Sequence, residues 1–231
     1  MKSEDSVLSA IAGYVDTLSF VALFGLFTAH VTGNFVLIGA SVAGFGQGVL
    51  LKLMAFPAFI AGVVLSSVLV RRQRPATPLH GACMLYVVQA VLLLAFCVSG
   101  IGLGREIPPD GWPAVICGML GAAAMGVQNA HGRLVARPGV PNTVMTGNVT
   151  QLVLDAVDLV SSQVSDEIKA AARTRFAKML PTIAAFGVGA IAGALAYRRT
   201  GFAALLLPFA ALVWLAAHAW IGRRSAAGVG R

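Results

Sequence analysis

Long apolar stretches alternate with short polar or basic segments along the whole chain. Six stretches are of transmembrane length, because a helix of about 20 apolar residues crosses the ~30 Å hydrocarbon layer of a bilayer. They are expected over 6–29, 53–70, 79–101, from Trp112 onward, 179–197 and 202–221. The pattern predicts an all-α membrane protein with six transmembrane helices.

Two further apolar segments are shorter or more polar. Residues 35–48 are rich in glycine and too short for a comfortable crossing, which favours a half-helix or a re-entrant segment packed among other helices. From Val149 onward the apolar positions fall on one side of a helix, and the other side carries Asp155 and Asp158. This helix is interpreted as amphipathic, with its acids on a solvated face at the membrane surface. The charged residues 165–178 are expected to connect it to the fifth span.

One short string occurs twice, as Thr32-Gly33-Asn34 and as Thr146-Gly147-Asn148. Each copy follows a long apolar stretch and precedes a new helical pattern, which marks a duplication. Glycine permits unusual backbone angles there, and Thr or Asn can cap the first N–H groups of the next helix. A helix that begins at such a break presents the positive end of its dipole to an anion or a polar ligand.

Flanking sequences extend the duplication. Gly13-Tyr14-Val15-Asp16 aligns with Gly126-Val127-Gln128-Asn129, each a similar distance before its Thr-Gly-Asn, so Asp16 and Asn129 are counterparts. The segments 62–66 and 189–193 also align without a gap, and each precedes an Arg-Arg pair. We therefore expect one transmembrane domain over 1–231 that contains two repeats, 6–103 and 111–224.

Composition and charge place the chain in a membrane. The 231 residues are 58% hydrophobic and 11% charged, with a mean hydropathy of +0.83, outside the range of soluble domains. The net charge of +8 does not indicate nucleic acid, because the basic residues form short clusters between the spans. We expect neither a separate soluble domain nor a cleaved signal peptide.

The positive-inside rule decides between topologies. With three spans in each half, 13 of the 17 Lys and Arg residues share the side of both termini, and the other side holds Lys52, Arg105, Arg198 and Arg199. Eight spans would divide the charges 10 to 7. The rule therefore favours six spans with both termini cytoplasmic, although Arg198 and Arg199 then violate it. Three spans per half make the repeats inverted, each with a broken or re-entrant helix at Thr-Gly-Asn, as in many secondary transporters.

A polar site is expected where the repeats meet. Asp16 lies near the middle of the first predicted span, and a buried carboxyl group there can carry a coupling proton. The alternative is a structural role, in which Asp16 ties the broken helices to backbone groups and Asn129. His30 precedes Thr32 closely enough to approach the same site. The candidate substrate-binding residues are Asp16, Thr32, Gly33, Asn34, Gln128, Asn129, Thr146, Gly147 and Asn148.

These features favour a secondary transporter for a small polar or anionic molecule, with proton coupling through Asp16. A passive pore or facilitator is the alternative, since it needs the same polar lining without a titratable carrier. An enzyme has little support, because the four histidines are scattered without a hydrolase or metalloprotease motif. Cys83, Cys97 and Cys117 lack metal-ligand spacing. We expect no catalytic residue, cofactor, metal or nucleic-acid partner.

With these paired motifs the chain resembles the YoaK family of bacterial inner-membrane proteins over nearly its whole length. The resemblance implies a small-molecule membrane transporter and supplies no residue roles. Within this sequence, Asn129 stands where strict two-fold symmetry would place a second carboxylate.

Overall fold

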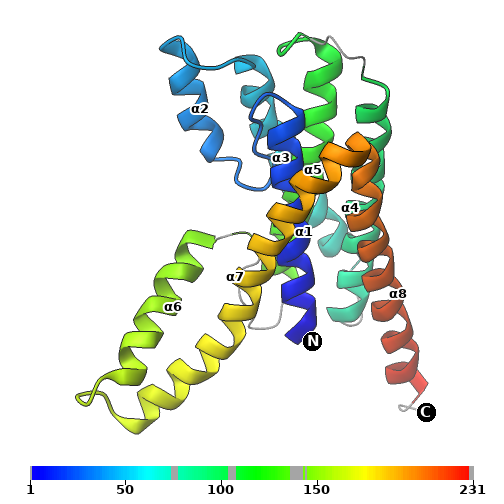
Figure 1. Ribbon diagram of the computed structural model, residues 1–231. Coiled ribbons are helices and arrows are strands. Elements are labelled where there is room, and N and C mark those ends of the chain that lie inside the picture. The colour runs from blue at the N-terminus through cyan, green and yellow to red at the C-terminus, as the bar shows by residue number, and fades with distance from the viewer. Residues whose placement is uncertain (1, 74–77, 104–107, 136–142, 144, 229–231) are drawn as a thin grey trace.

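The computed structural model is all-helical and describes residues 2–73, 78–103, 108–135, 143 and 145–228 (Figure 1). The long helices are α1 (Lys2–Ala22), α3 (Val49–Gln73), α4 (Pro78–Ile101), α5 (Trp112–Leu134), α7 (Asp166–Thr200) and α8 (Leu206–Gly228). The short helices are α2 (Gly33–Val42) and α6 (Met145–Val160), and a 3-10 turn, η1 (Gly201–Leu205), joins α7 to α8. The predicted all-α class is confirmed.

Four segments of the described chain are long and apolar enough to cross a membrane. They are Val49–Arg72, His80–Ile101, Trp112–Leu134 and Asp166–Gly222. The last segment contains both α7 and α8, which the sequence pattern separates into two spans. Helix α1 is not among the four, and its buried side chains include Ser9, Asp16 and Ser19.

The first helix is shorter than predicted. The expected span 6–29 ends at Ala22, because Phe24 and Gly25 adopt positive φ angles of 52° and 80° and turn the chain out of the helix. Residues 23–32 then form a loop before α2. Helix α2 has 10 residues and a length of about 15 Å, which confirms that this segment is too short to cross a bilayer alone.

The charged stretch 165–178 is not a connection, which corrects a prediction. It forms the first part of α7, a helix of 35 residues. Ser165 stands at the N-cap in extended conformation, and Asp166 and Glu167 follow in the first turn, where negative charge stabilises a helix. The absence of glycine from 166–178 lets the helix continue into the apolar part.

The long helices pack in close pairs, and the pair α1 and α7 is held by glycine. A Cβ atom added to Gly13 would lie 2.2 Å from the carbonyl oxygen of Phe186. One added to Gly189 would lie 2.1 Å from that of Ala10. Such contacts leave room for no side chain larger than hydrogen.

The pair α3 and α5 repeats this arrangement. A Cβ atom on Gly62 would lie 2.2 Å from the carbonyl oxygen of Ala123, and one on Gly126 would lie 2.3 Å from that of Phe59. Gly62 therefore lies at a close contact between the two helices. Helices α2 and α6 lie beside these pairs, toward opposite ends of the molecule, and both termini lie near one end (Figure 1).

Candidate functional site

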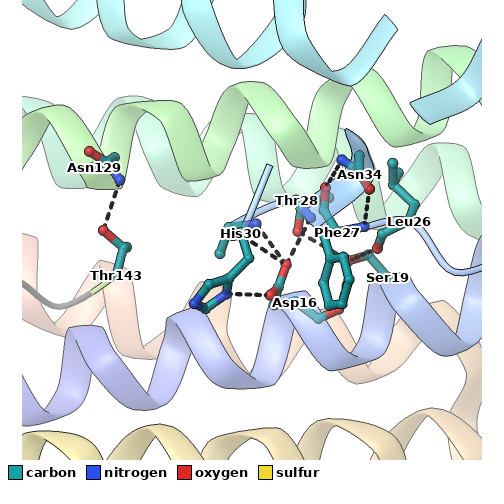
Figure 2. A network of polar contacts seen from close by, with 10 residues as sticks. Asp16, Ser19, Leu26, Phe27, Thr28, His30, Asn34, Asn129 and Thr143 are labelled. Atoms are coloured by element: carbon teal, nitrogen blue, oxygen red, sulfur yellow. Dashed lines mark hydrogen bonds and ion pairs between the residues drawn. The ribbon is translucent and has the colours of Figure 1, made fainter. Parts of the chain in front are cut away.

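Asp16 organises the break between α1 and α2. Its Oδ1 atom accepts hydrogen bonds from the backbone N–H groups of Thr28 at 2.8 Å, Ala29 at 2.7 Å and His30 at 3.4 Å (Figure 2). These N–H groups belong to the loop 23–32, which lacks the carbonyl partners of a regular helix. Asp16 is only 4% exposed, so its carboxylate substitutes for those partners inside the protein.

His30, which belongs to the loop, also contacts the carboxylate of Asp16. Its Nδ1 atom lies 2.7 Å from Oδ2 of Asp16, and the two side chains point toward each other in Figure 2. With Asp16 ionised, Nδ1 donates the hydrogen bond, because a carboxylate can only accept. The other side of the ring packs edge-on against Phe186 of α7, with centroids 5.3 Å apart. A shared proton therefore joins α1 to the loop beside α7.

Two more polar side chains fix the shape of the loop. Ser19 contacts the carbonyl oxygen of Leu26 at 3.1 Å and the hydroxyl of Thr28 at 3.1 Å. Asn34 is fully buried and pairs with both backbone groups of Phe27, accepting from its N–H at 3.0 Å and donating to its oxygen at 2.8 Å. The amide of Asn34 thus closes the loop.

The first Thr-Gly-Asn differs in detail from the prediction. Thr32 occupies the N-cap of α2 but makes no side-chain capping bond, so the expected capping role is wrong for this residue. Gly33 begins the helix, and a Cβ atom there would lie 3.0 Å from the ring of Phe27. The packing of Phe27 therefore requires a very small residue at this position.

The second break is organised by Asn129. Its Nδ2 atom donates to the hydroxyl of Thr143 at 2.8 Å, and this pair stands apart from the Asp16 contacts in Figure 2. Helix α6 begins at Met145, so Thr146, Gly147 and Asn148 lie in its first turn, with Asn148 3% exposed. The sequence predicts extended chain over 141–145; of these residues Met145 instead begins α6, and 141, 142 and 144 lie outside the described residues.

Gln128 belongs to a different network. It is fully buried, its Nε2 atom donates to the carbonyl oxygen of Leu8 at 2.7 Å, and its Oε1 atom accepts from Gln89 at 2.7 Å. This network joins α1, α4 and α5. The structure thus gathers Asp16, Thr32, Gly33 and Asn34 at the first break and Asn129 with the second Thr-Gly-Asn at the other, while Gln128 serves the helix core.

Lys52, which directly precedes the second predicted span, is buried in the protein. The residue is 2% exposed and lies beneath the first break. Its Nζ atom donates to the carbonyl oxygen of Phe24 at 2.8 Å and also to that of Gln47. Lys52 therefore ties the loop before α2 to the turn after it. The signal available in the sequence was a single lysine followed at once by a long apolar run.

Asp155 on α6 is not on a solvated face, which corrects the interpretation of that helix. The side chain has no exposed surface, and its Oδ1 atom accepts from Nη2 of Arg175 at 2.6 Å and from Gln151 at 2.9 Å. Burial raises the pKa of Asp155, but the hydrogen bonds from Arg175 and Gln151 outweigh burial and hold this pKa below its ordinary value. The ion pair fastens α6 to α7.

Within the described part of the chain, no group of three or more His, Cys, Asp or Glu side chains is arranged to hold a metal ion. Among the described residues, the clearest titratable contact at a break is the pair Asp16 and His30.

Comparison with known proteins identifies the family. A family described as "Protein of unknown function (DUF1275)" matches residues 6–218. The UPF0700 transmembrane protein YoaK of Bacillus subtilis (strain 168) is 29% identical over 152 residues, which cover 65% of this chain and 64% of that protein. No solved structure matches. The resemblance to the YoaK family is confirmed, and the chain belongs to the DUF1275 family of multi-pass membrane proteins.

Proposed function

We propose that this protein is a small-molecule transporter of the bacterial cytoplasmic membrane, with a coupling proton carried by Asp16 and His30. The observation that carries the proposal is their buried contact, with Nδ1 and Oδ2 2.7 Å apart, at the point where α1 gives way to a loop. A carboxylate inside an apolar helix bundle is costly and typically marks an ion or substrate path. Its partners here sit on a loop and not on a rigid helix.

The proposal includes two inverted three-helix repeats, 6–103 and 111–224. Helices α1, α3 and α4 would correspond to α5, α7 and α8. The glycine contacts support this correspondence: Gly13 meets the backbone of α7 as Gly126 meets that of α3, and Gly189 meets α1 as Gly62 meets α5. The shift from α1 to α5 is 113 positions (126 − 13), and the shift from α3 to α7 is 127 positions (189 − 62), so each helix keeps one shift and the two shifts differ by the length of the chain between the helices.

Six of the helices would cross the membrane, and α2 and α6 would not. Helix α2 is too short, and α6 carries the buried ion pair of Asp155 with Arg175. Both termini would then be cytoplasmic, together with most of the Lys and Arg residues. The two Thr-Gly-Asn segments, with Asn129 and Gln128 nearby on α5, would lie between the repeats, where substrates of such transporters bind.

The hydrogen bonds of Asp16 suggest how a proton and a substrate are coupled. In its ionised form, Asp16 occupies the N–H groups of 28–30 and holds the loop against α1. Protonation removes the negative charge, so these donors and the His30 ring become available to another anion. A small polar or anionic substrate then takes the place of the Asp16 carboxylate at these donors. The loop is released, and its movement changes the side of the membrane to which the site opens. Proton and substrate therefore travel together.

This mechanism is tested with purified protein and a panel of small carboxylates and polar metabolites. A ligand that binds the folded state raises the Tm, and uptake of that ligand into liposomes should follow an imposed proton gradient. We expect both responses in the wild type and in Asp158→Asn, a control outside the breaks. Uptake should be lost in Asp16→Asn and reduced to a smaller extent in His30→Gln. Full gradient-driven uptake by folded Asp16→Asn would overturn the role of Asp16.

A passive facilitator is the second candidate. The observation in its favour is that Asp16 already has three N–H donors and His30, which is sufficient for a purely structural carboxylate. Substrate flux would then be independent of a proton gradient and would survive His30→Gln. Neither candidate assigns an enzymatic activity, a cofactor or a metal to the chain, and both have the lipid bilayer and a small molecule as partners.

A further inference from the structure

A buried histidine lies near the end of α5, two residues after Asn129, and takes no part in the hydrogen bonds described at the two breaks. His131 is 6% exposed, and neither of its ring nitrogens has a hydrogen-bond partner among the described residues. A neutral imidazole carries one N–H donor and one acceptor, and buried polar groups of this kind are almost always paired. The unpaired ring therefore indicates a ligand.

Burial of the His131 ring opposes a positive charge, and two neighbouring groups offset this effect in part. Its ring stacks on Tyr86 of α4, with centroids 4.8 Å apart and planes inclined by 30°. The hydroxyl of Tyr86 donates to the carboxylate of Glu4, whose negative charge acts on His131. An aromatic face and a nearby carboxylate both stabilise a cation.

The other charged groups are placed around this pair. Asp5 follows Glu4 on α1 and acts on Tyr86. Helix α4 also carries Cys83 and His80 toward its start, each with contacts of its own. Helix α3, which packs on α5, ends with Arg71 and Arg72, both exposed. Of these groups, Glu4 is therefore the one whose charge acts on His131.

One helical turn farther into the bundle, the same three helices carry the buried network of Leu8, Gln89 and Gln128. Polar groups thus occupy two successive layers at the junction of α1, α4 and α5. The next residues along α1 and α4 in this direction are apolar, among them Ala12 and Leu93, both fully buried.

We propose that His131 is a proton-binding site, with Glu4 as the counter-ion and Tyr86 as a residue that tunes it. A proton taken from solvent converts the unpaired neutral ring into an imidazolium with two N–H donors, and an oxygen of Glu4 accepts from one of them. Tyr86 competes for the same carboxylate through its hydroxyl. The site does not depend on the proposed transport activity, because it uses none of the residues at the two breaks.

The test is the titration of His131 by NMR of histidine-labelled protein in detergent, between pH 5 and pH 8. Its signal is assigned by its absence in His131→Gln, or by elimination with His30→Gln, His80→Gln and His218→Gln. Glu4→Gln should shift the midpoint down by about one pH unit, a tenfold loss of proton affinity. Tyr86→Phe keeps the stacked ring but frees the carboxylate, so it should shift the midpoint up.

Opposite shifts in these two variants, with no shift in His218→Gln, would establish the site. The proposal is overturned if the His131 signal does not titrate in this range, or if its midpoint is the same in Glu4→Gln as in the wild type. Both readings come from the protein without any substrate, so they stand whether or not transport is found.

Discussion

The two helix breaks occupy corresponding places in the chain and are built from different chemistry. At the first, a carboxylate, Asp16, holds three backbone N–H groups and a histidine. At the second, a neutral amide, Asn129, makes one hydrogen bond to the hydroxyl of Thr143. Among the described residues, the first break is therefore organised by a carboxylate, and the second by a neutral amide.

This difference suggests a division of labour between the halves. Under the transport mechanism proposed above, a single carboxylate would allow one proton to control the whole molecule. The break at Asn129 would then provide a fixed surface against which the break at Asp16 moves. The following predictions test whether the two breaks differ in this way, in order of decreasing effect.

The largest effect is expected at Asp16. Asp16→Asn removes the buried charge and turns an amide group toward backbone donors, so the free energy of unfolding should fall by about 3 kcal/mol. The loss is measured as a lower Tm and a lower denaturant midpoint in detergent. The reciprocal change, Asn129→Asp, should cost only about 1 kcal/mol, because the hydroxyl of Thr143 can rotate to donate to a carboxylate. Equal losses at the two positions would contradict the division of roles.

The helix pairs α1 with α7 and α3 with α5, by contrast, are expected to lose similar stability when their contact glycines are replaced. Gly189→Ala and Gly62→Ala each force a methyl group to within 2.2 Å of a carbonyl oxygen on the opposing helix, so each should lower stability by about 2 kcal/mol. Gly187→Ala on α7 and Gly132→Ala on α5 are matched controls, because no atom lies within 4 Å of the added methyl group. They should leave the Tm unchanged or raise it slightly. A large loss at only one of the two contact glycines would argue against equivalent helix pairs.

Much of this architecture follows from the sequence because it depends on local properties. Apolar length predicted the long apolar helices α3, α4, α5, α7 and α8, although it also predicted a span over 6–29, which is not among the segments long and apolar enough to cross a membrane. The repeated Thr-Gly-Asn marked both places where a new short helix begins. Asp16 was singled out because a carboxylate in an apolar stretch requires partners, and the structure supplies them from the loop 12 to 14 residues later.

The details that could not be predicted depend on partners distant in sequence. Lys52 is buried because two carbonyl oxygens in turns of positive φ converge on it, which no local pattern indicates. The acids of α6 have the spacing of a solvated face, but Arg175 on the next helix buries one of them. Likewise, the early end of α1 results from the loop that Asp16 holds, because the apolar pattern itself continues to residue 29.

The smallest effect is expected at the two short helices, which differ in the contact that attaches each of them to its neighbouring long helix. Helix α2 is joined to α3 by the aromatic contact of Phe35 with Phe56, whose centroids lie 4.1 Å apart, and α6 is joined to α7 by Asp155 with Arg175. An aromatic contact has no titratable group. The carboxyl pKa of Asp155 is depressed in the folded state, so the pair stabilises the protein above the ordinary carboxyl pKa of about 3.9 and loses this effect as the pH falls through the lower folded value.

Acid should therefore loosen α6 and leave α2 in place. Spin labels at Val160 on α6 and at Val42 on α2, both strongly exposed, report the mobility of each helix by EPR in a background without the three native cysteines. Below about pH 4 the label on α6 should become more mobile and the label on α2 should not. Arg175→Gln should produce the same mobility of α6 already at neutral pH. If acid loosened both helices equally, the response would be general unfolding, and the ion pair would not be what distinguishes the second half from the first.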